Sequence, residues 1–495
     1  MSLYYRSTRG DKKIVSSLEA IVKGIADDGG LYVPSHFPNI DKTLSELLEM
    51  SYNDLAFYII NKFFPEFDKE ELLECVNGAY DDKFDTQLIA PVESKGDTHF
   101  LELYHGPTLA FKDMALSILP YLLKTSMKKL NHSKEVVILT ATSGDTGKAA
   151  LEGFKDVEGT KIIVFYPEKG VSEVQKRQMI TQEGSNTYVV GIKGNFDDAQ
   201  NGVKEAFNNI DFNKELENKG FDLSSANSIN IGRLVPQVVY YFYGYLNLVK
   251  KSAIKKGEKI NVVVPTGNFG NILAAYYAKK MGLPINKFIC ASNENNVLCD
   301  FINTGKYDRK RELKLTVSPS MDILISSNLE RFLYEISNNN DGIVKEMMNR
   351  LTEEGIYTIS EEMREKLSDF YGNFATEEET YEAIKKVYED TKYIIDTHTA
   401  VAYSVYEKYV KEIGDKTQTL IASTASPFKF TRSVCDALGL ETDDYNDFQL
   451  IYKLSEKGNL NIPLPIKGLE NKEILHDRVC DKDEIKESIK NLLGI

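Results

Sequence analysis

The sequence predicts an α/β protein whose sheets are mostly parallel and are covered by helices on both faces. Short apolar or β-branched runs recur from residue 99 onward, and segments long enough for a helix separate most of them. The runs are continuous rather than alternating, which is typical of strands buried on both faces. Such sheets bind ligands at the carboxyl ends of their strands. The predicted strands are 99–104, 135–142, 161–167, 186–192, 260–267, 287–292 and 418–424.

The chain divides by composition into parts. Apolar residues over 41–64 are spaced by three and four, so residues 1–98 are expected to form a helical N-terminal lobe. A core of two α/β lobes is expected over 99–304 and 393–435. Residues 305–392 are charged and mostly helical in pattern, which indicates an insertion beside that core. Residues 436–495 are expected to form a tail that packs on the core.

The composition disfavours several classes of binding partner. The 495 residues carry a net charge of -14, which disfavours nucleic acid and anionic membranes because both would repel the chain. The five cysteines include no CxxC pair, so neither a disulfide framework nor a metal site is expected. No apolar run approaches the roughly 20 residues of a spanning helix, and no signal-peptide core follows the N-terminus. We expect a cytoplasmic protein, and a local basic pocket for a small anion remains compatible with this net charge.

Two strand-to-helix turns favour anions. The first is Gly267-Asn268-Phe269-Gly270-Asn271, which follows a buried strand and precedes an alanine- and tyrosine-rich helix. Free N–H groups at a helix start attract phosphate, and glycines let it approach closely. The spacing is not that of the GxGxxG fingerprint, and an ordinary turn is the alternative interpretation.

The second turn spans residues 142–147, "TSGDTG", and offers hydroxyl and N–H donors. It is a poor P-loop because Thr142 and Ala149 stand where glycine and Ser or Thr are required. A simple N-cap cluster would explain it equally well. A third segment, 423–427, places small hydroxyls at another strand end, although turn chemistry alone accounts for most such patterns.

Lys112 lies directly behind Phe111 in the stretch "LAFKDMAL", where most neighbours are apolar. An apolar setting disfavours the ammonium form of a lysine and makes its amine a usable nucleophile. The alternative is a lysine whose stem carries its charge out to solvent.

Several motifs together resemble the threonine synthases, which are pyridoxal-phosphate enzymes of the tryptophan-synthase-β fold type (fold type II). The resemblance covers about residues 4 to 435, and the charged insertion resembles the longer bacterial and fungal branch. The motifs occur in the family's order and at roughly its spacing. They are "RSTRG", "GIADDGGLYVP", "HGPTLAFKDMAL", "TATSGDTGKAA", "FYPEKGVSEVQKRQM", "SANSINIGR", "PTGNFGN" and "DTHTAVA".

The resemblance implies a role for each matching position. Lys112 would form the Schiff base with pyridoxal 5'-phosphate, Phe111 would lie near the cofactor ring, and Thr424 would bond the pyridine nitrogen. The cofactor phosphate would be wrapped by Gly267, Asn268, Phe269, Gly270 and Asn271. The substrate carboxylate would lie at Thr142, Ser143, Gly144, Asp145 and Thr146. Candidates for the substrate phosphate are Lys169, Ser172, Gln175, Arg177, Asn227, Ser228, Asn230 and Arg233.

The implied activity is the conversion of O-phospho-L-homoserine and water to L-threonine and phosphate, by γ-elimination and β-addition of water. Lys112 is the expected acid and base for several proton transfers. The family often has histidine where this chain has Ser426, so no role is carried over for that side chain. His398 matches the family, although a structural hydrogen bond is the commoner role for a lone histidine. The alternatives are a related phospholyase or dehydratase that yields a 2-oxo acid, and a non-catalytic sensor of a phosphorylated ligand.

Overall fold

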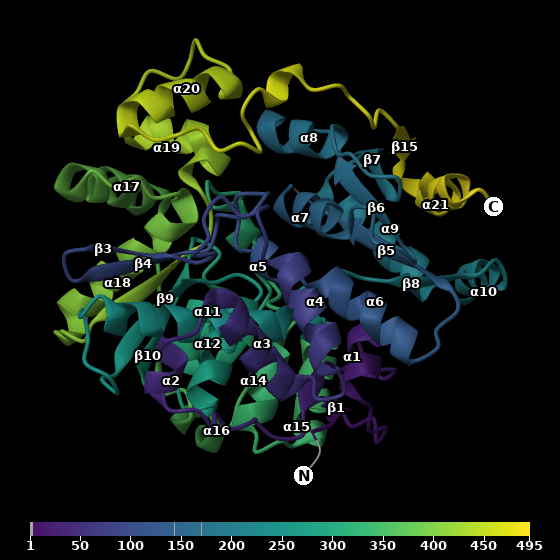
Figure 1. Cartoon of the computed structure of the whole chain (residues 1–495), viewed down its shortest axis with the longest axis horizontal. Coiled ribbons are helices and arrows are strands. Elements are labelled where there is room, and N and C mark those ends of the chain that lie inside the picture. The colour runs from purple at the N-terminus through teal and green to yellow at the C-terminus, as the bar shows by residue number, and fades with distance from the viewer. Residues whose placement is uncertain (1–2, 143, 170) are drawn as a thin grey trace.

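Two sheets form the two lobes of the molecule (Figure 1). The computed structural model describes residues 3–142, 144–169 and 171–495. One sheet has six strands in the order β13-β10-β9-β14-β4-β3, and the other has five in the order β15-β7-β6-β5-β8. Every neighbouring pair is parallel except β3 with β4. The mostly parallel α/β fold expected from the sequence is therefore confirmed.

All the strands predicted from apolar runs are present, as β4, β5, β6, β7, β9, β10 and β14. Further strands complete the sheets at their edges or form small ribbons. The bounds of the core strands are β3 Val92–Lys95, β4 Thr98–Glu102, β5 Glu135–Ala141, β6 Thr160–Pro167, β7 Thr187–Lys193, β8 Phe221–Ser224, β9 Ile260–Pro265, β10 Ile285–Ser292, β13 Phe370–Phe374, β14 Thr419–Ser423 and β15 Val479–Asp481.

Both faces of each sheet are buried, which explains why the strands are continuously apolar. In β9, Val262 and Val264 join the large core cluster with α11 and α12, whereas Val263 faces the cluster formed with α17 and α18. Val136 and Val137 of β5 divide in the same way, toward α7 on one face and toward α9 on the other. The helices of these layers are α5 Asp113–Leu116, α6 Leu119–Lys129, α7 Asp145–Phe154, α8 Glu173–Ile180, α9 Phe196–Asn208, α10 Ile210–Asn218, α11 Ile231–Lys250, α12 Gly270–Lys280, α13 Val297–Thr304, α17 Glu377–Thr391 and α18 Thr397–Ile413.

The N-terminal lobe packs against the six-stranded half of the molecule (Figure 1). Its helices are capped as their sequences predict: Ser16, Thr43 and Ser51 each accept a hydrogen bond from the third residue of the helix that follows. The lobe also contains an antiparallel ribbon of two strands. Its elements are β1 Tyr5–Ser7, α1 Ser17–Lys23, β2 Tyr32–Pro34, α2 Leu44–Leu48, α3 Tyr52–Phe63 and α4 Lys69–Ala79.

Residues 305–392 contain helices, as expected, but also strands. β13 pairs with β10 and forms the edge of the six-stranded sheet, so this segment contributes to the core instead of only lying beside it. The sequence of β13, "FYGNF", hides the strand because glycine and asparagine disfavour strands on propensity. The other elements are β11 Lys306–Asp308, α14 Leu329–Ile336, α15 Asp341–Glu353, β12 Ile356–Thr358 and α16 Glu361–Glu365. The division of the chain into domains stays a prediction.

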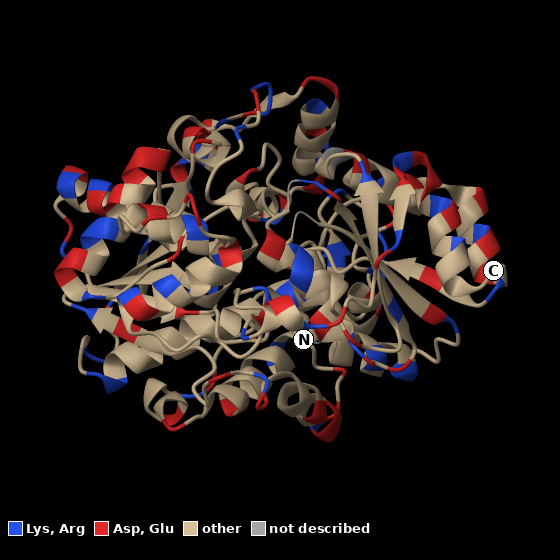
Figure 2. Cartoon of the chain, turned by 90° about the horizontal axis from the view of Figure 1, so that it is seen from above, with Lys and Arg blue, Asp and Glu red and all other residues tan. Residues whose placement is uncertain are grey.

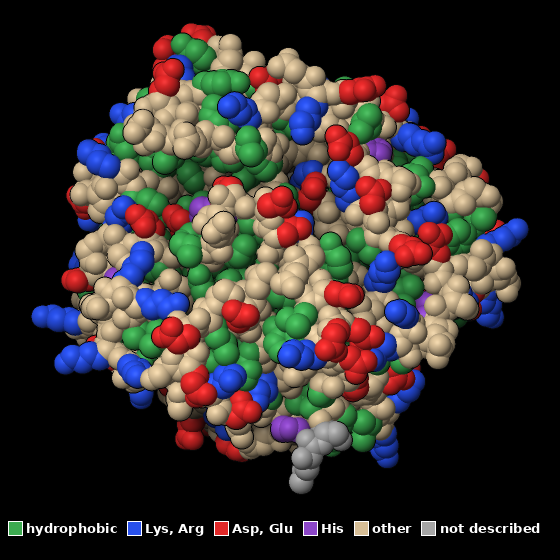
Figure 3. All heavy atoms as spheres, viewed as in Figure 1, with side chains coloured by type: hydrophobic (Ala, Val, Ile, Leu, Met, Phe, Trp, Pro, Cys, Tyr) green, Lys and Arg blue, Asp and Glu red, His purple; other side chains and the backbone are tan. Residues whose placement is uncertain are grey.

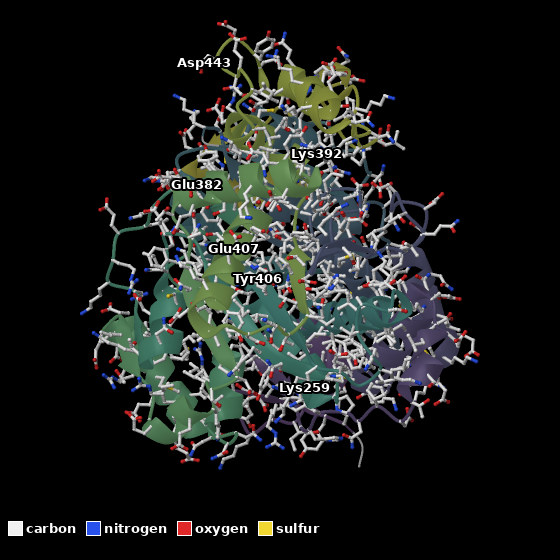
Figure 4. The ribbon with its side chains drawn as sticks, turned by 90° about the vertical axis from the view of Figure 1, so that its left-hand side faces the viewer. Lys259, Glu382, Lys392, Tyr406, Glu407 and Asp443 are labelled. Atoms are coloured by element: carbon white, nitrogen blue, oxygen red, sulfur yellow. The ribbon has the colours of Figure 1, made fainter. Side chains whose placement is uncertain are left out.

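On the outer face of the six-stranded sheet, α17 lies against α18 (Figure 4). The Nζ atom of Lys386 on α17 is 3.4 Å from a carboxylate oxygen of Glu407 on α18. Helix α18 in turn contacts β9, β10 and β14. The N-terminus of α18 is thereby held near the strand ends where ligands bind in folds of this kind.

The C-terminal tail crosses from one lobe to the other (Figure 1). It leaves α19 Thr431–Ala437 and α20 Asp447–Gly458, and its N–H groups at Leu475 and His476 donate to the carbonyl oxygen of Ile180 on α8. It then adds β15 to the edge of the five-stranded sheet and ends in α21 Ile485–Leu493, which packs on α9. The tail is therefore a covalent link between the two lobes.

Acidic and basic residues are interspersed along the ribbon of both lobes (Figure 2). Hydrophobic side chains on the face seen in Figure 3 are scattered among charged ones. Among the described residues, no helix is both long and apolar enough to cross a membrane.

Glu330 on α14 holds the start of the chain, and we expect its charge to matter for stability. Its carboxylate accepts from Arg9 Nε at 2.9 Å, Arg9 Nη2 at 2.7 Å and Thr8 Oγ1 at 2.5 Å, and its side chain is 5% exposed. E330Q should lower the free energy of unfolding by about 1.5–3 kcal/mol, since the buried bonds to a charged acceptor are lost. Urea denaturation followed by circular dichroism measures this change.

The matched control is D27N, which removes an exposed ion pair with Lys23 in the same lobe. Its effect should stay below about 0.5 kcal/mol. Equal losses in the two variants would contradict a special role for Glu330.

Candidate active site

The candidate site is a cavity between the two lobes, formed where carboxyl ends of strands from both sheets converge. It holds about 830 Å³ of empty space, including its solvent-filled opening. Its walls come from the segments after β4, β5, β9 and β14, from helix α11, from the short turn at 319–321 and from the start of α18. Ligand sites in parallel α/β folds occur at this position.

Lys112 lines this cavity and is largely buried. Its side chain is 12% exposed, and Nζ lies 3.2 Å from Ser320 Oγ, 3.4 Å from Asp145 Oδ2 and 5.9 Å from the centre of the Phe111 ring. Burial lowers the pKa of the Lys112 amine, and the nearby Asp145 carboxylate partly opposes that shift. The Lys112 nitrogen is therefore a buried amine among polar partners.

The loop before Lys112 is fixed to the end of β14 by backbone bonds. The Phe111 N–H donates to the Thr424 carbonyl at 2.8 Å, and the Ser426 N–H donates to the Leu109 carbonyl at 3.0 Å. Leu109 has a φ of 60°, which a leucine rarely adopts and which the surrounding bonds maintain. Ser426 acts here through its backbone, and its Oγ accepts from the Phe428 N–H at 3.3 Å.

The glycine turn at 267–271 faces Lys112 across the cavity and leads into α12. A Cβ atom at Gly267 would lie 2.7 Å from the carbonyl oxygen of Ser320, so only glycine fits against that backbone. Ser326 Oγ donates to the Gly267 carbonyl at 2.7 Å, and the Asn328 N–H donates to the Asn268 carbonyl at 3.0 Å. The turn is thus held from outside, and its inner side is left for a ligand.

Two buried donors in the cavity wall have no partner among the described residues. Asn271 Nδ2 makes no hydrogen bond, although its Oδ1 accepts from the hydroxyl of Tyr241. Arg233 donates from Nη1 to the Ala226 carbonyl at 2.8 Å, but its Nε is unpaired. Burial lowers the pKa of the Arg233 guanidinium to about 10, and within the described chain no carboxylate forms an ion pair with it. Unsatisfied buried donors are costly, so this wall is suited to an anion.

Asp145, the first residue of α7, is the only carboxylate among the described residues that line the cavity. Its Oδ1 contacts Lys429 Nζ at 3.1 Å and Gln175 Nε2 at 2.7 Å, while Oδ2 accepts from Ser320 Oγ at 3.0 Å. Burial alone would raise the pKa of Asp145. Lys429 and Lys112 outweigh that effect and hold the pKa well below its usual range.

His398 supports the turn that carries Ser320. Its Nε2 accepts from the Ser320 N–H at 3.2 Å, so the ring proton lies on Nδ1, which is 3.0 Å from Asp396 Oδ2. Asp396 also caps α18 by accepting from the N–H groups of His398 and Thr399. The imidazole is therefore anchored and lines the cavity with a defined tautomer.

The structure brings most of the sequence-predicted site residues to one place. Those in the cavity wall are Phe111, Lys112, Asp145, Thr146, Asn227, Ser228, Arg233, Gly267, Asn268, Phe269, Gly270, Asn271 and Thr424. Ser143 lies outside the described residues. The roles assigned to these residues by resemblance stay predictions.

Other predicted site residues lie away from the wall and have local structural roles. Thr142 Oγ1 accepts from the N–H groups of Gly144 and Gly147, each at 3.0 Å. Ser172 and Asn230 are the N-caps of α8 and α11, and Lys169 is exposed. Arg177 is directed to the tail, where it donates to the carbonyls of residues 469, 470 and 472.

Sequence reasoning missed several residues that the fold brings to the cavity. Ser320 and Met321 come from a segment interpreted as an insertion, and Gln237 lies one turn beyond Arg233 on α11. The sequence carries no signal for these. Lys429 did have one, because "PFKF" places a lysine behind phenylalanine in an apolar segment, just as at Lys112.

Comparison with known proteins agrees with this geometry. A family model described as "Pyridoxal-phosphate dependent enzyme" matches residues 93–424, and two others, "Threonine synthase N terminus" and "Threonine synthase, C-terminal", match 4–80 and 399–489. Threonine synthase of Schizosaccharomyces pombe is 36% identical, over 89% of this chain and 90% of its own length. This chain belongs to the threonine synthase family.

Other members of the threonine synthase family resemble the chain along most of its length. The crystal structure of the yeast enzyme has a TM-score of 0.89 at 34% identity, and that of PLP-bound threonine synthase from Brucella melitensis has 0.88 at 34%, each covering 99% of both chains. Human "Threonine synthase-like 1" is 40% identical over 96% of this chain. The chain spans only 65% of the length of that human relative.

Gly267 offers a test of the cavity. In G267A the added methyl meets a backbone carbonyl at 2.7 Å, so the turn or the Ser320 segment must move. We expect the affinity for pyridoxal phosphate to fall about tenfold or more, because overpacking of this kind costs about 1–3 kcal/mol. Absorbance titration of the cofactor-free protein measures this affinity.

G342A is the control, since a Cβ there meets only the side chain of Asn340 at 3.4 Å in the first turn of α15. Its cofactor affinity should match that of the unchanged protein. A G267A variant with unchanged affinity would show that the turn does not contact the cofactor.

Proposed function

We propose that this chain is a threonine synthase that converts O-phospho-L-homoserine and water to L-threonine and phosphate with bound pyridoxal phosphate. The observation that carries this proposal is the composition of one cavity wall. Three features line the same space: a largely buried lysine amine, a glycine turn at a helix start and a buried arginine that has no carboxylate partner among the described residues. An enzyme that joins an amine to a cofactor aldehyde and holds phosphate groups needs these features together.

The residues present fit pyridoxal phosphate. Among the described residues, Asn271 Nδ2 beside the glycine turn is a buried donor without a partner, and a Cβ at Gly267 would meet the carbonyl oxygen of Ser320. The first N–H groups of α12 have no partner within the helix and attract phosphate. The backbone of residues 267–271 would therefore hold the cofactor phosphate, and Thr424 is the residue expected to contact the pyridine nitrogen.

When bound, pyridoxal phosphate supplies an electron sink that stabilises negative charge on substrate carbon atoms. Lys112 is the residue to which it would be attached. Because burial lowers the pKa of the Lys112 amine, its nitrogen can lose a proton readily and can carry protons to and from the substrate. Ser320 and Asp145 accept hydrogen bonds from this nitrogen and orient it.

The substrate carries a carboxylate and a phosphate, and the cavity has donors for both. Arg233 is the strongest candidate for one anion, since a guanidinium can donate two parallel bonds to oxygen atoms. Asn227 and Ser228 lie in the same wall. Lys169, Ser172, Arg177 and Asn230 do not line the cavity and are left out of the proposed contacts.

The cellular setting stays part of the proposal. All five cysteines are free and four of them are buried, an arrangement common in proteins of the reducing cytoplasm. Its partner is a small-molecule substrate, and a monomer or homodimer is the expected state.

Arg233 and Arg177 form a matched pair for mutation. R233A should raise the KM for O-phospho-L-homoserine about tenfold to a hundredfold, because bonds between charged groups contribute about 1.5–3 kcal/mol each. R177A should change kcat/KM by less than about threefold and should instead speed proteolysis of the tail around residues 469–472, to which Arg177 donates. Steady-state kinetics and limited proteolysis measure the two effects. The opposite pattern would place the substrate phosphate at Arg177.

Lys112 is the residue expected both to carry the cofactor and to transfer protons. Borohydride reduction followed by peptide mapping should find the cofactor on residue 112, and K112A should carry no label and lose about a thousandfold or more in kcat. Label on Lys148 or Lys429, the other buried lysines nearby, would move the assignment to that residue.

The products separate the competing functions. Threonine with one equivalent of phosphate supports the proposal, whereas 2-oxobutyrate with phosphate indicates the phospholyase. A chain that binds O-phospho-L-homoserine and releases neither product would be the sensor.

A further inference from the structure

Lys429 is a second buried lysine beside the cavity, and the proposed chemistry does not use it. It lies in the short 3-10 turn Pro427–Phe430 after β14, and its side chain is 1% exposed. Its Nζ donates to the Thr108 carbonyl at 2.8 Å and to Asp145 Oδ1 at 3.1 Å, and Gln178 Oε1 is 3.5 Å away. All three partners are acceptors, which matches the three N–H donors of an ammonium group. Lys429 is not in the cavity wall.

The two oxygens of the Asp145 carboxylate have different surroundings, one in the interior and one at the cavity. Oδ1 contacts Lys429 and Gln175, which lie behind the wall. Oδ2 contacts Lys112 and Ser320, which line the cavity. The orientation of the oxygen that Lys112 meets is therefore set by partners that a ligand does not touch.

The charge on Asp145 would become a problem when Lys112 reacts. A lysine must lose its proton before its nitrogen can attack a carbonyl carbon. If Lys112 were the only cation near Asp145, that loss would leave a buried carboxylate without a counter-ion, which is strongly unfavourable. It would also place an unbalanced negative charge in a cavity that must receive two anionic groups. Lys429 removes both difficulties, since it stays paired with Asp145 whatever the state of Lys112.

We propose that Lys429 is a positioning residue: it is the permanent counter-ion of Asp145, and it thereby allows Lys112 to lose its proton and to react inside a cavity that admits anions. This inference rests on the proposed function, in which Lys112 is the reacting amine. It assigns Lys429 no contact with substrate or cofactor.

Other titratable groups also face this pair. Arg233 on α11 acts on Lys112 with the same sign as Lys429, and His398 at the start of α18 lies near Asp145. Asp113 and Lys148 interact with Lys429 from the side away from the cavity wall. Asp396 lies behind His398, at 3.0 Å from its Nδ1. Except for Lys148 in its own variant, these groups keep their chemical identity in the variants below.

The test measures how the chemical labelling of Lys112 depends on pH in the full-length chain after its cofactor has been removed. Circular dichroism checks that each variant is folded. Dinitrofluorobenzene reacts only with a neutral amine, and peptide mass spectrometry counts the label on residue 112. K429M removes the charge and keeps the length of the side chain. Its midpoint for labelling should lie about one pH unit or more above that of the unchanged protein, because Lys112 is then the only lysine paired with Asp145.

K148M is the matched control. Lys148 is also buried in this region, but it pairs with Glu152 and Gln182 and does not touch Asp145. In K148M the labelling midpoint of Lys112 should move by less than about 0.3 pH unit. K429R, which keeps the charge, should restore the original midpoint, and K429Q replaces K429M if methionine is not accommodated.

A D145N background completes the cycle. With the carboxylate gone, K429M should raise the midpoint of Lys112 by clearly less than it does in the unchanged protein, because only the direct repulsion between the two lysines is then removed. The inference is overturned if K429M leaves the midpoint unchanged, if K148M moves it equally, or if the upward shift is as large in D145N. The labelling needs neither cofactor nor substrate, so the two proposals can fail separately. If the chain makes threonine but K429M does not shift the labelling midpoint, only this inference is wrong. If the shift is found but the chain makes no threonine, only the proposed function is wrong.

Discussion

The buried contacts of Asp145 join the two lobes at the point where the cavity lies. Asp145 belongs to the five-stranded lobe, since it starts the helix after β5, whereas Lys112 and Lys429 follow β4 and β14 of the six-stranded sheet. Ser320 comes from the long segment between β10 and β13. Four pieces of chain that are distant in sequence therefore meet at one carboxylate. Removing such a buried charge from water is unfavourable unless it is fully paired, so this geometry constrains how the lobes can pack.

The strands that form the sheet interiors could be predicted because burial on both faces leaves a continuous apolar record, as in β9 with its run of valines. The edge strands could not be predicted in this way. β8 has the sequence "FDLS" and β15 the sequence "VCD", and both are only partly covered by other elements. A strand that contacts few other elements needs few apolar residues, so its sequence carries little signal of a strand. Its pairing is decided by the neighbouring strand, as when β15 of the tail aligns with β7.

The same distinction holds for the site. Lys112, the 267–271 turn and Thr424 could be placed together because neighbouring parallel strands bring their carboxyl ends to one edge. The choice between Arg177 and Arg233 could not be made from sequence, since both arginines occur in polar segments with suitable neighbours. Packing decides it: Arg233 lies in the buried first turn of α11, whereas Arg177 on α8 faces the crossing tail. Ser320 had no signal at all, because it lies in the long segment between β10 and β13, where no sequence pattern marks a strand end.

The cavity concentrates positive charge within an acidic chain. With a net charge of -14, the protein as a whole repels anions, so a phosphorylated amino acid can be held only by a local excess of cationic groups. On one wall the Asp145 carboxylate is matched by lysines and adds little net field. On another, Arg233 has no carboxylate partner among the described residues, in a setting where low polarity strengthens electrostatic attraction. We therefore expect an anion to be drawn toward Arg233 instead of toward Lys429. In the proposal above, the two amines near Asp145 then have separate tasks: Lys112 reacts and Lys429 compensates charge.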